Sequence, residues 1–126
     1  MGILEAAKPV MLICVRDRAR ATAFYRDTLG LTMTGEDDYA TIFSIGGIAL
    51  RVSTVADFMP HEHTVLGFQV TDVAAMVKAL SEKGVVFNRY AQFKQDELGI
   101  LAVPGTATQV AWFKDPDGNV LSITNG

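Results

Sequence analysis

Hydrophobic residues along the chain form short continuous runs and stripes at helical spacing. Pro9 to Val15 is an apolar run flanked by polar residues, which predicts a buried strand. Asp17 follows it as a candidate helix N-cap, and Gly30 stands where a left-handed C-cap ends a helix. Between them apolar residues recur at the spacing of one helix face, so we predict a helix over 18–29.

The next apolar segments, 40–45 and 48–52, are rich in β-branched and aliphatic residues and predict two strands. Gly46 and Gly47 separate them. Two adjacent glycines predict a tight hairpin turn, because such turns need positive φ at their central positions. The acidic stretch 36–38 before these strands predicts a solvated loop.

The same pattern returns in the second half of the chain. Thr64 to Val70 predicts a strand, Asp72 an N-cap, and the apolar stripe that ends at Gly84 a helix. The turn residues 115–118 precede a last strand. The strands predicted after the second helix are 85–93, 99–103, 108–113 and 119–124.

Both halves therefore follow one order, a strand, a helix and then strands, which indicates an internal repeat. Segment 15–17 matches segment 70–72 in this alignment of the halves, and Gly30 matches Gly84 after a gap of one residue. Neither half can bury its sheet surface and edges alone, so we expect the two to pack together. The predicted fold is α+β in a single domain over 1–126, with module one at about 8–53, a connection at 54–63 and module two at about 64–125.

Composition and net charge limit the classes of binding partner that we expect. The chain has 126 residues, of which 49% are hydrophobic, and a net charge of −3, so a compact globule that does not bind nucleic acid is expected. Four arginines lie close together in the sequence, but Asp17 and Asp27 are interleaved with them, and this favours a solvated helix face; the four are Arg16, Arg18, Arg20 and Arg26. A single cysteine, Cys14, excludes an intrachain disulfide and favours the cytoplasm. No apolar run approaches the length of a membrane span, so no membrane partner is expected.

Two motifs carry a family resemblance. Segment 24–31, FYRDTLGL, follows a strand, and segment 113–119, FKDPDGN, precedes the last strand. Together they resemble the glyoxalase/bleomycin resistance/extradiol dioxygenase proteins, the vicinal oxygen chelate superfamily. The resemblance implies two βαβββ modules whose curled mixed sheets form a cleft, and it implies a homodimer.

Members of that superfamily that use a divalent metal hold it with His, Glu or Gln at four strand positions. Transferred residue by residue, these positions are Val10 and Val65 on the first strand of each module and Arg51 and Ser122 on the last. Two of these side chains have no donor atom, one is a fixed cation, and one is a lone hydroxyl. We therefore predict no metal and no other cofactor, and the catalytic residues, if any, stay unknown.

The face that would hold a metal is instead predicted to line a ligand cleft. Its mostly apolar side chains with few polar groups suit a small organic ligand. Arg51 would pair a carboxylate or phosphate of the ligand; the alternatives are an internal acid or a partner subunit. Cys14 is either a reactive thiol or a small buried residue. The predicted cleft residues are Arg51, Gln69, Ser122, Cys14, Val10, Val65 and Trp112.

Three functional hypotheses stay open from the sequence. The first is a metal-free protein that binds and sequesters a small anionic or partly apolar compound. The second is an enzyme, either a lyase similar to lactoylglutathione lyase with a displaced metal site at His61 and His63, or one with a metal-independent mechanism. The third is a scaffold without a ligand. Segment 88–99, which contains aromatic and acidic residues, is expected to form a lid or a dimer contact.

Overall fold

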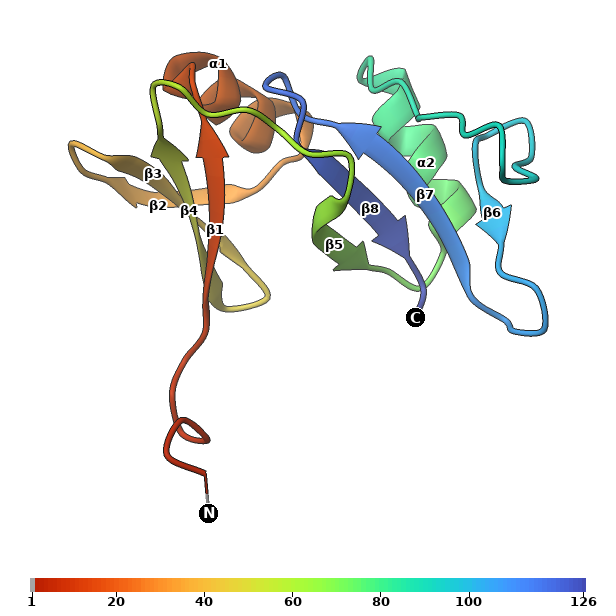
Figure 1. The fold of residues 1–126 in the computed structure, drawn as a ribbon, viewed down its shortest axis with the longest axis horizontal. Helices are drawn as coiled ribbons and strands as arrows, with labels where there is room; N and C mark the ends of the chain where they lie inside the picture. Colours follow the sequence, from red (N-terminus) through yellow and green to blue (C-terminus); the bar gives the residue numbers. More distant parts are fainter. Residues whose placement is uncertain (1) are drawn as a thin grey trace. The chain divides into compact units, whose positions relative to one another are not determined.

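The computed structural model describes residues 2–126 (Figure 1). It separates into two compact units, Met1–Phe58 and Met59–Gly126, and each carries a four-stranded sheet. Both units follow the order βαβββ, which confirms the predicted α+β class. No helix in the described part of the chain is long and apolar enough to cross a membrane.

The first unit orders its strands β1-β4-β3-β2. β1 runs parallel to β4, and the other pairs are antiparallel. Gly46 and Gly47, both at positive φ, form the predicted hairpin turn between β3 and β4. The elements of this unit are β1 (Val10–Val15), α1 (Arg18–Ala23), the π-helical turn η1 (Phe24–Thr28), β2 (Thr32–Glu36), β3 (Ala40–Ile45) and β4 (Ile48–Thr54).

The first helix begins and ends where its capping residues predict. The carboxylate of Asp17 accepts a hydrogen bond from the backbone N–H of Arg20, and Gly30 adopts a φ of 73° just after the helix. The predicted continuous α-helix is interrupted, however, because its second half winds as η1, where the N–H of Leu29 donates to the carbonyl of Phe24. The wider turn leaves the Tyr25 side chain fully buried against the sheet.

The second unit repeats the arrangement with the order β5-β8-β7-β6. Asp72 caps α2 by accepting from the N–H of Ala75, and the apolar stripe of α2 packs on β7 and β8. Gly84 ends the helix at a φ of 94°. The elements are β5 (Thr64–Gln69), α2 (Val73–Glu82), β6 (Leu101–Ala102), β7 (Gln109–Lys114) and β8 (Val120–Thr124).

Two predicted strands need correction, and one observed strand was not predicted. The segment at 85–93 is not a strand: Phe87 forms an isolated bridge to Phe113, the N–H of Asn88 donates to the carbonyl of Trp112, and no further ladder pairing follows in this segment. The strand predicted at 99–103 is reduced to β6. Conversely β2 was not predicted, because its sequence TMTGE lacks an apolar alternation strong enough to show an edge strand.

Each sheet has one face covered by its helix. In the first unit α1 contacts β3 and β4, and the side chains beneath it are buried, as Leu50 and Val52 show with no exposed surface. In the second unit Leu121 and Ile123 are buried in the same way under α2. We call the other face of each sheet its open face.

Candidate functional site

The open face of the first sheet carries the residues predicted for a ligand cleft. The strand register places Leu12 beside Arg51 on β4, and Arg51 beside Ile42 on β3. We call Leu12–Arg51–Ile42 the first row. Leu12 is 63% exposed, whereas Ile13, the next residue on β1, is 3% exposed. The alternation along β1 therefore places Leu12 on the open face and Ile13 on the helix side, and Arg51 stands between two aliphatic side chains.

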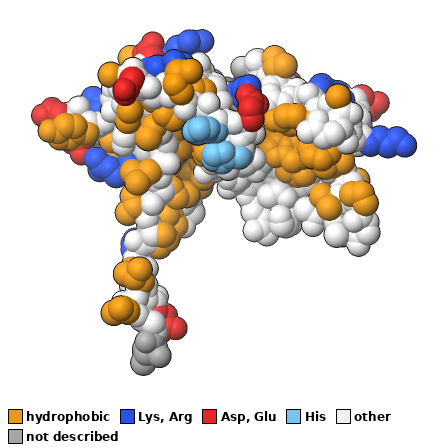
Figure 2. All heavy atoms as spheres, in the orientation of Figure 1, with side chains coloured by type: hydrophobic (Ala, Val, Ile, Leu, Met, Phe, Trp, Pro, Cys, Tyr) orange, Lys and Arg blue, Asp and Glu red, His pale blue; other side chains and the backbone are white. Residues whose placement is uncertain are grey.

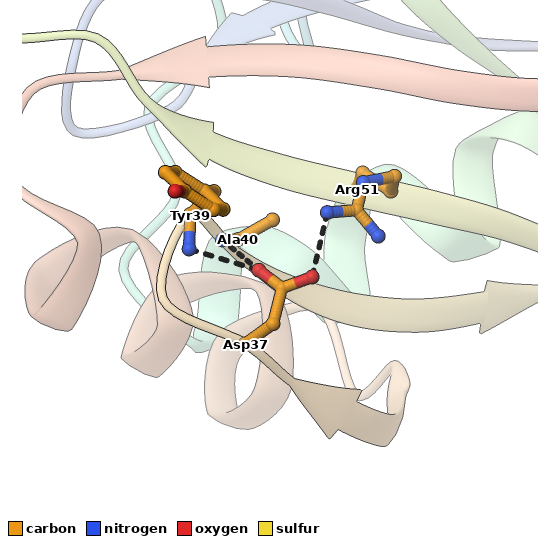
Figure 3. A network of polar contacts seen from close by, with 4 residues as sticks. All are labelled: Asp37, Tyr39, Ala40 and Arg51. Atoms are coloured by element: carbon orange, nitrogen blue, oxygen red, sulfur yellow. Dashed lines mark hydrogen bonds and ion pairs between the residues drawn. The ribbon is translucent and has the colours of Figure 1, made fainter.

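Arg51 is held by an acid of its own unit (Figure 3). One Nη atom of Arg51 donates to Oδ2 of Asp37 at 2.8 Å. The other carboxylate oxygen, Oδ1, accepts the backbone N–H groups of Tyr39 and Ala40, each at 2.8 Å. The Arg51 hydrogen bond and then these backbone bonds lower the pKa of Asp37 to about 2. Asp37 is thus a fixed anion that orients Arg51.

Sequence reasoning left an internal acid open as a partner of Arg51 but did not identify Asp37, which was assigned to a solvated loop. The sequence around Asp37 could indicate a turn but not its proximity to Arg51. An Asp that accepts N–H groups two and three residues ahead forms an Asx-type turn, and this turn joins β2 to β3. Pairing of β3 with β4 then places that turn beside Arg51.

The open face of the second sheet has a row at the corresponding position. Gly67 of β5 pairs with Ser122 of β8, and Ser122 pairs with Trp112 of β7. We call Gly67–Ser122–Trp112 the second row. Ser122 is 7% exposed, and a Cβ atom built on Gly67 would lie 2.9 Å from the Ser122 Oγ. The glycine therefore allows the close approach of the serine hydroxyl.

Trp112 lies in an aromatic cluster that we define as Tyr90, Phe93 and Trp112. The Phe93 ring stacks on the Trp112 ring with centroids 5.4 Å apart and planes 17° apart. Tyr90 meets Trp112 edge to face at 5.4 Å and Phe93 at 5.9 Å. Phe113, the neighbour of Trp112 on β7, is fully buried on the helix side. Trp112 is therefore the member of this pair that faces the open side.

Segment 88–99 brings the two other rings to Trp112. The Gln95 amide donates to the carbonyls of Asn88 and Gly99 at 2.8 Å, and its oxygen accepts the N–H of Tyr90. Arg89 donates to the carbonyls of Asp96 and Glu97. These bonds fix the two ends of the loop, while Phe93 at its tip is 41% exposed. The segment predicted to be a lid or a dimer contact therefore packs on its own sheet.

The four positions at which the resemblance places metal ligands carry no imidazole, carboxylate or carboxamide side chain. Val10 and Val65 are 54% and 42% exposed and have no donor atom, and Arg51 is a cation paired to an acid. Ser122 contributes only a hydroxyl, and a register shift beside Val65 separates that residue from the ladder. This donor set does not fit a divalent cation. Within residues 2–126 no group of three or more His, Cys, Asp or Glu side chains could hold one.

The two histidines lie together at the surface of the second unit (Figure 2). The rings of His61 and His63 stack with centroids 5.5 Å apart and planes 23° apart. The carboxylate of Glu62, which stands between them in the sequence, lies 3.4 Å from the Lys114 ammonium. The acid of this run is therefore paired with a lysine.

The remaining candidates lie at different depths. Cys14 is half-buried and has a contact partner, so it is neither a bare surface thiol nor a fully buried residue. Gln69 is exposed and pairs in register with Thr124. The turn after β7 is structural, as predicted: one Asp115 oxygen accepts the N–H groups of Asp117 and Asn119, and Gly118 has a φ of 94°.

Comparison with known proteins places this geometry in a family. The family model "Glyoxalase/Bleomycin resistance protein/Dioxygenase superfamily" matches residues 7–123. No curated protein matches the chain.

Several solved structures share the fold at low sequence identity. A glyoxalase family protein from Enterococcus faecalis is 17% identical with a TM-score of 0.73, covering 97% of this chain and 99% of that one. The fosfomycin resistance protein FosX from Listeria monocytogenes is 14% identical with a TM-score of 0.75, covering 96% and 93%. Lactoylglutathione lyase from Agrobacterium tumefaciens is 17% identical with a TM-score of 0.70, covering 95% of each chain. Because the family model matches nearly the whole length of this chain, the chain belongs to the glyoxalase/bleomycin resistance protein/dioxygenase superfamily.

Proposed function

We propose that this chain is a small-molecule-binding protein of its superfamily that works without a metal ion and sequesters an anionic, partly apolar compound. The observation that carries the proposal is the chemistry of the open faces. Where a divalent cation would need carboxylates or imidazoles, the chain has two valines, a paired arginine and a serine. These groups suit an organic ligand held by apolar contact and a few directed hydrogen bonds.

Arg51 is the proposed anchor for the anionic group. Asp37 engages one Nη atom, and the other N–H groups of Arg51 have no partner within residues 2–126. A guanidinium oriented by an acid and flanked by Leu12 and Ile42 offers donors to a carboxylate or phosphate beside an apolar surface. This role supports an acidic ligand with an aliphatic or aromatic body.

The open face of the second sheet carries further proposed ligand-contacting groups of its own. Trp112 and the exposed Phe93 offer aromatic surface, while Ser122 and Gln69 offer hydrogen-bonding groups. The remaining proposed ligand-contacting residues are Val10 and Cys14 on β1 and Val65 on β5.

The first experiment measures metal content and ligand response on the same preparation. Elemental analysis of purified protein is expected to give far less than one Zn, Ni, Fe or Mn per chain. A thermal-shift screen of small carboxylates and phosphates, with and without a chelator, should find stabilising compounds whose effect the chelator does not change. Stoichiometric metal with turnover of a substrate would overturn the proposal in favour of an enzyme such as a lyase.

A displaced metal site has its own control. If metal is found, replacing His61 and His63 by Ala together distinguishes a site at these histidines from one elsewhere. Loss of metal in that double variant would assign the site to the stacked pair, and the metal-free mechanism would be wrong.

Arg51 is tested by substitution. Arg51→Met should fold and should weaken an acidic ligand from the screen by about 1.5–3 kcal/mol, the usual contribution of a hydrogen bond to a charged group. Arg51→Lys should recover only part of the affinity, because an ammonium cannot form a bidentate pair. Lys78→Met, an exposed cation on α2, is the matched control and should bind as the unmodified protein does. Unchanged affinity in Arg51→Met would show that Arg51 serves only Asp37.

A homodimer is the proposed assembly. β1 and β5 are edge strands of their sheets, and the exposed side chains of Val10, Leu12 and Val65 on them are apolar. A second copy would cover such edges. Light scattering at increasing concentration should give twice the 13.6 kDa chain mass; one chain mass throughout would contradict the assembly.

A further inference from the structure

The first unit has a hollow on the helix-covered side of its sheet. It has a volume of about 600 Å³ and opens to solvent. Arg18 and Thr22 of α1 and Arg26 of η1 line one side of it. Glu36 at the end of β2 and Thr41 of β3 line the other.

This hollow is separate from the proposed ligand face. The Thr22 and Thr41 hydroxyls lie 2.9 Å apart, which places Thr41 under α1, and Thr41 is 1% exposed. Ile42, the next residue on β3, pairs in register with Arg51 on the open face. Because side chains alternate along a strand, the hollow and the Arg51 row lie on opposite faces of one sheet.

Arg18, which lines the hollow, has a buried donor atom that lacks an acceptor. Its Nη1 atom is buried and has no hydrogen-bond partner among the described residues. A guanidinium carries five N–H donors and keeps its charge. A buried donor without an acceptor destabilises the protein, because it has lost its hydrogen bonds to water and gained none in return. Because Arg18 also lines the hollow, an anionic group bound there would compensate the charge of this guanidinium.

The other charges around the hollow decide which anions fit. Arg26 is already neutralised, because its Nε and Nη2 atoms donate to the two carboxylate oxygens of Asp27 at 2.8 and 3.0 Å. Glu36 and Asp38 are exposed carboxylates that also line the hollow. A simple anion would be repelled by these two acids, whereas a ligand that also carries an ammonium would be attracted by them.

We propose that this hollow is a second ligand site, for a small amphoteric molecule with a carboxylate or phosphate at one end and an ammonium at the other. The oxyanion pairs with the Arg18 guanidinium, and the ammonium lies towards Glu36 and Asp38. The hydroxyls of Thr22 and Thr54, which also line the hollow, are available to either end. The proposal depends on neither Arg51 nor the metal-free function of the open faces.

The experiment titrates ¹⁵N-labelled full-length protein with small probes and follows the backbone amide signals. L-Serine and O-phosphoethanolamine are the amphoteric probes, one with a carboxylate and the other with a phosphate. Acetate and inorganic phosphate supply the anion alone, and ethanolamine supplies the cation alone. The amphoteric probes should shift the signals of residues 18–26 and 36–41 at lower concentration than any of the three single-ended probes. The amphoteric probe that binds at the lower concentration shows whether the site prefers a carboxylate or a phosphate.

Substitution of Arg18 provides the decisive variant. Arg18→Met should weaken the amphoteric probe about 10- to 100-fold, the range expected for a lost charge-assisted hydrogen bond. Arg20→Met is the matched control, because Arg20 is an exposed cation on the same helix that does not line the hollow, and its affinity should be unchanged. Without any probe, Arg18→Met should be at least as thermally stable as the unmodified protein, because it removes a buried donor that has no acceptor.

Three outcomes would overturn the proposal. They are no shift in the two segments at 50 mM of either amphoteric probe, equal shifts in the Arg18→Met variant, or binding of acetate or inorganic phosphate as tight as that of the amphoteric probes. Should Arg18→Met fail to fold, the double variant Glu36→Gln with Asp38→Asn takes its place. That variant should lose the advantage of the amphoteric probes over inorganic phosphate, and an unchanged advantage would contradict the site.

Discussion

Arg51 and Ser122 occupy corresponding places, each four residues after a turn glycine on the last strand of its unit, yet their neighbours differ in kind. The first row sets Arg51 between two aliphatic side chains and pairs it with the acidic turn at Asp37. The second row sets Ser122 between Gly67, which has no side chain, and Trp112, which has the largest.

The difference shows how one topology can present two chemistries. In the first unit the loop between β2 and β3 is short and supplies a charge to the open face. In the second unit the long loop before β6 supplies two aromatic rings instead. A repeat of backbone structure fixes where a side chain points, and the loops then decide what surrounds it.

The largest expected effect follows removal of the Trp112 ring. Trp112→Ala should lower the free energy of unfolding by about 2–3 kcal/mol, somewhat less than for a fully buried tryptophan, because two ring contacts are lost. Ile42→Ala at the corresponding place in the first row should cost only about 1 kcal/mol. Chemical denaturation of both variants measures the contrast, and equal losses would show that the aromatic cluster adds nothing to stability.

The second effect concerns the close approach at Gly67. Gly67→Ala should destabilise the protein by about 1–2 kcal/mol, because the new methyl group would meet the Ser122 Oγ. Ser122→Ala in the same chain removes that oxygen and should restore most of the loss. Leu12→Ala is the counterpart in the first row, where the side chain is largely exposed, and it should change stability little. A double variant no more stable than Gly67→Ala alone would contradict this contact.

A smaller effect is expected at Phe93. Trp112 is the single tryptophan, so its fluorescence reports directly on the aromatic cluster. Phe93→Ala should shift the emission to longer wavelength by exposing the indole, with a stability loss of about 0.5–1.5 kcal/mol. Phe93→Leu restores apolar cover without an aromatic ring and should reverse much of the shift. An unchanged spectrum would mean that Phe93 does not cover Trp112 in solution.

The smallest effect is the pH dependence of the first row. Folding lowers the pKa of Asp37 from its ordinary value of 3.8 to about 2, so its ionised form stabilises the fold above the ordinary value. This contribution is lost as pH falls from about 4 through 2. Denaturation midpoints of the unmodified protein and Asp37→Asn should differ at pH 7 and converge only as pH falls to about 2. A difference that stays constant over this range would exclude titration of Asp37 as its cause.

Much of the fold could be predicted from local signals. The N-caps Asp17 and Asp72 and the glycines at positive φ mark element ends through bonds that span a few residues, so the sequence alone located both helices. The predictions failed where local signals and tertiary packing disagreed. Segment 85–93 is apolar enough for a strand, but its side chains bury against Phe113 and Trp112 without ladder pairing.

The sequence by itself determined the repeated order of a strand, a helix and further strands, the alternation of side chains along the strands and the absence of donor atoms at Val10 and Val65, because each of these depends on residue type and spacing. Only the tertiary structure decided that Asp37 pairs with Arg51, that Tyr90 and Phe93 pack on Trp112, and that Arg18 Nη1 is buried without an acceptor. The first two are contacts between different structural elements, and the burial of Arg18 Nη1 depends on how such elements pack. Such contacts depend on how loops return to the sheet, and no local pattern of residues encodes that path.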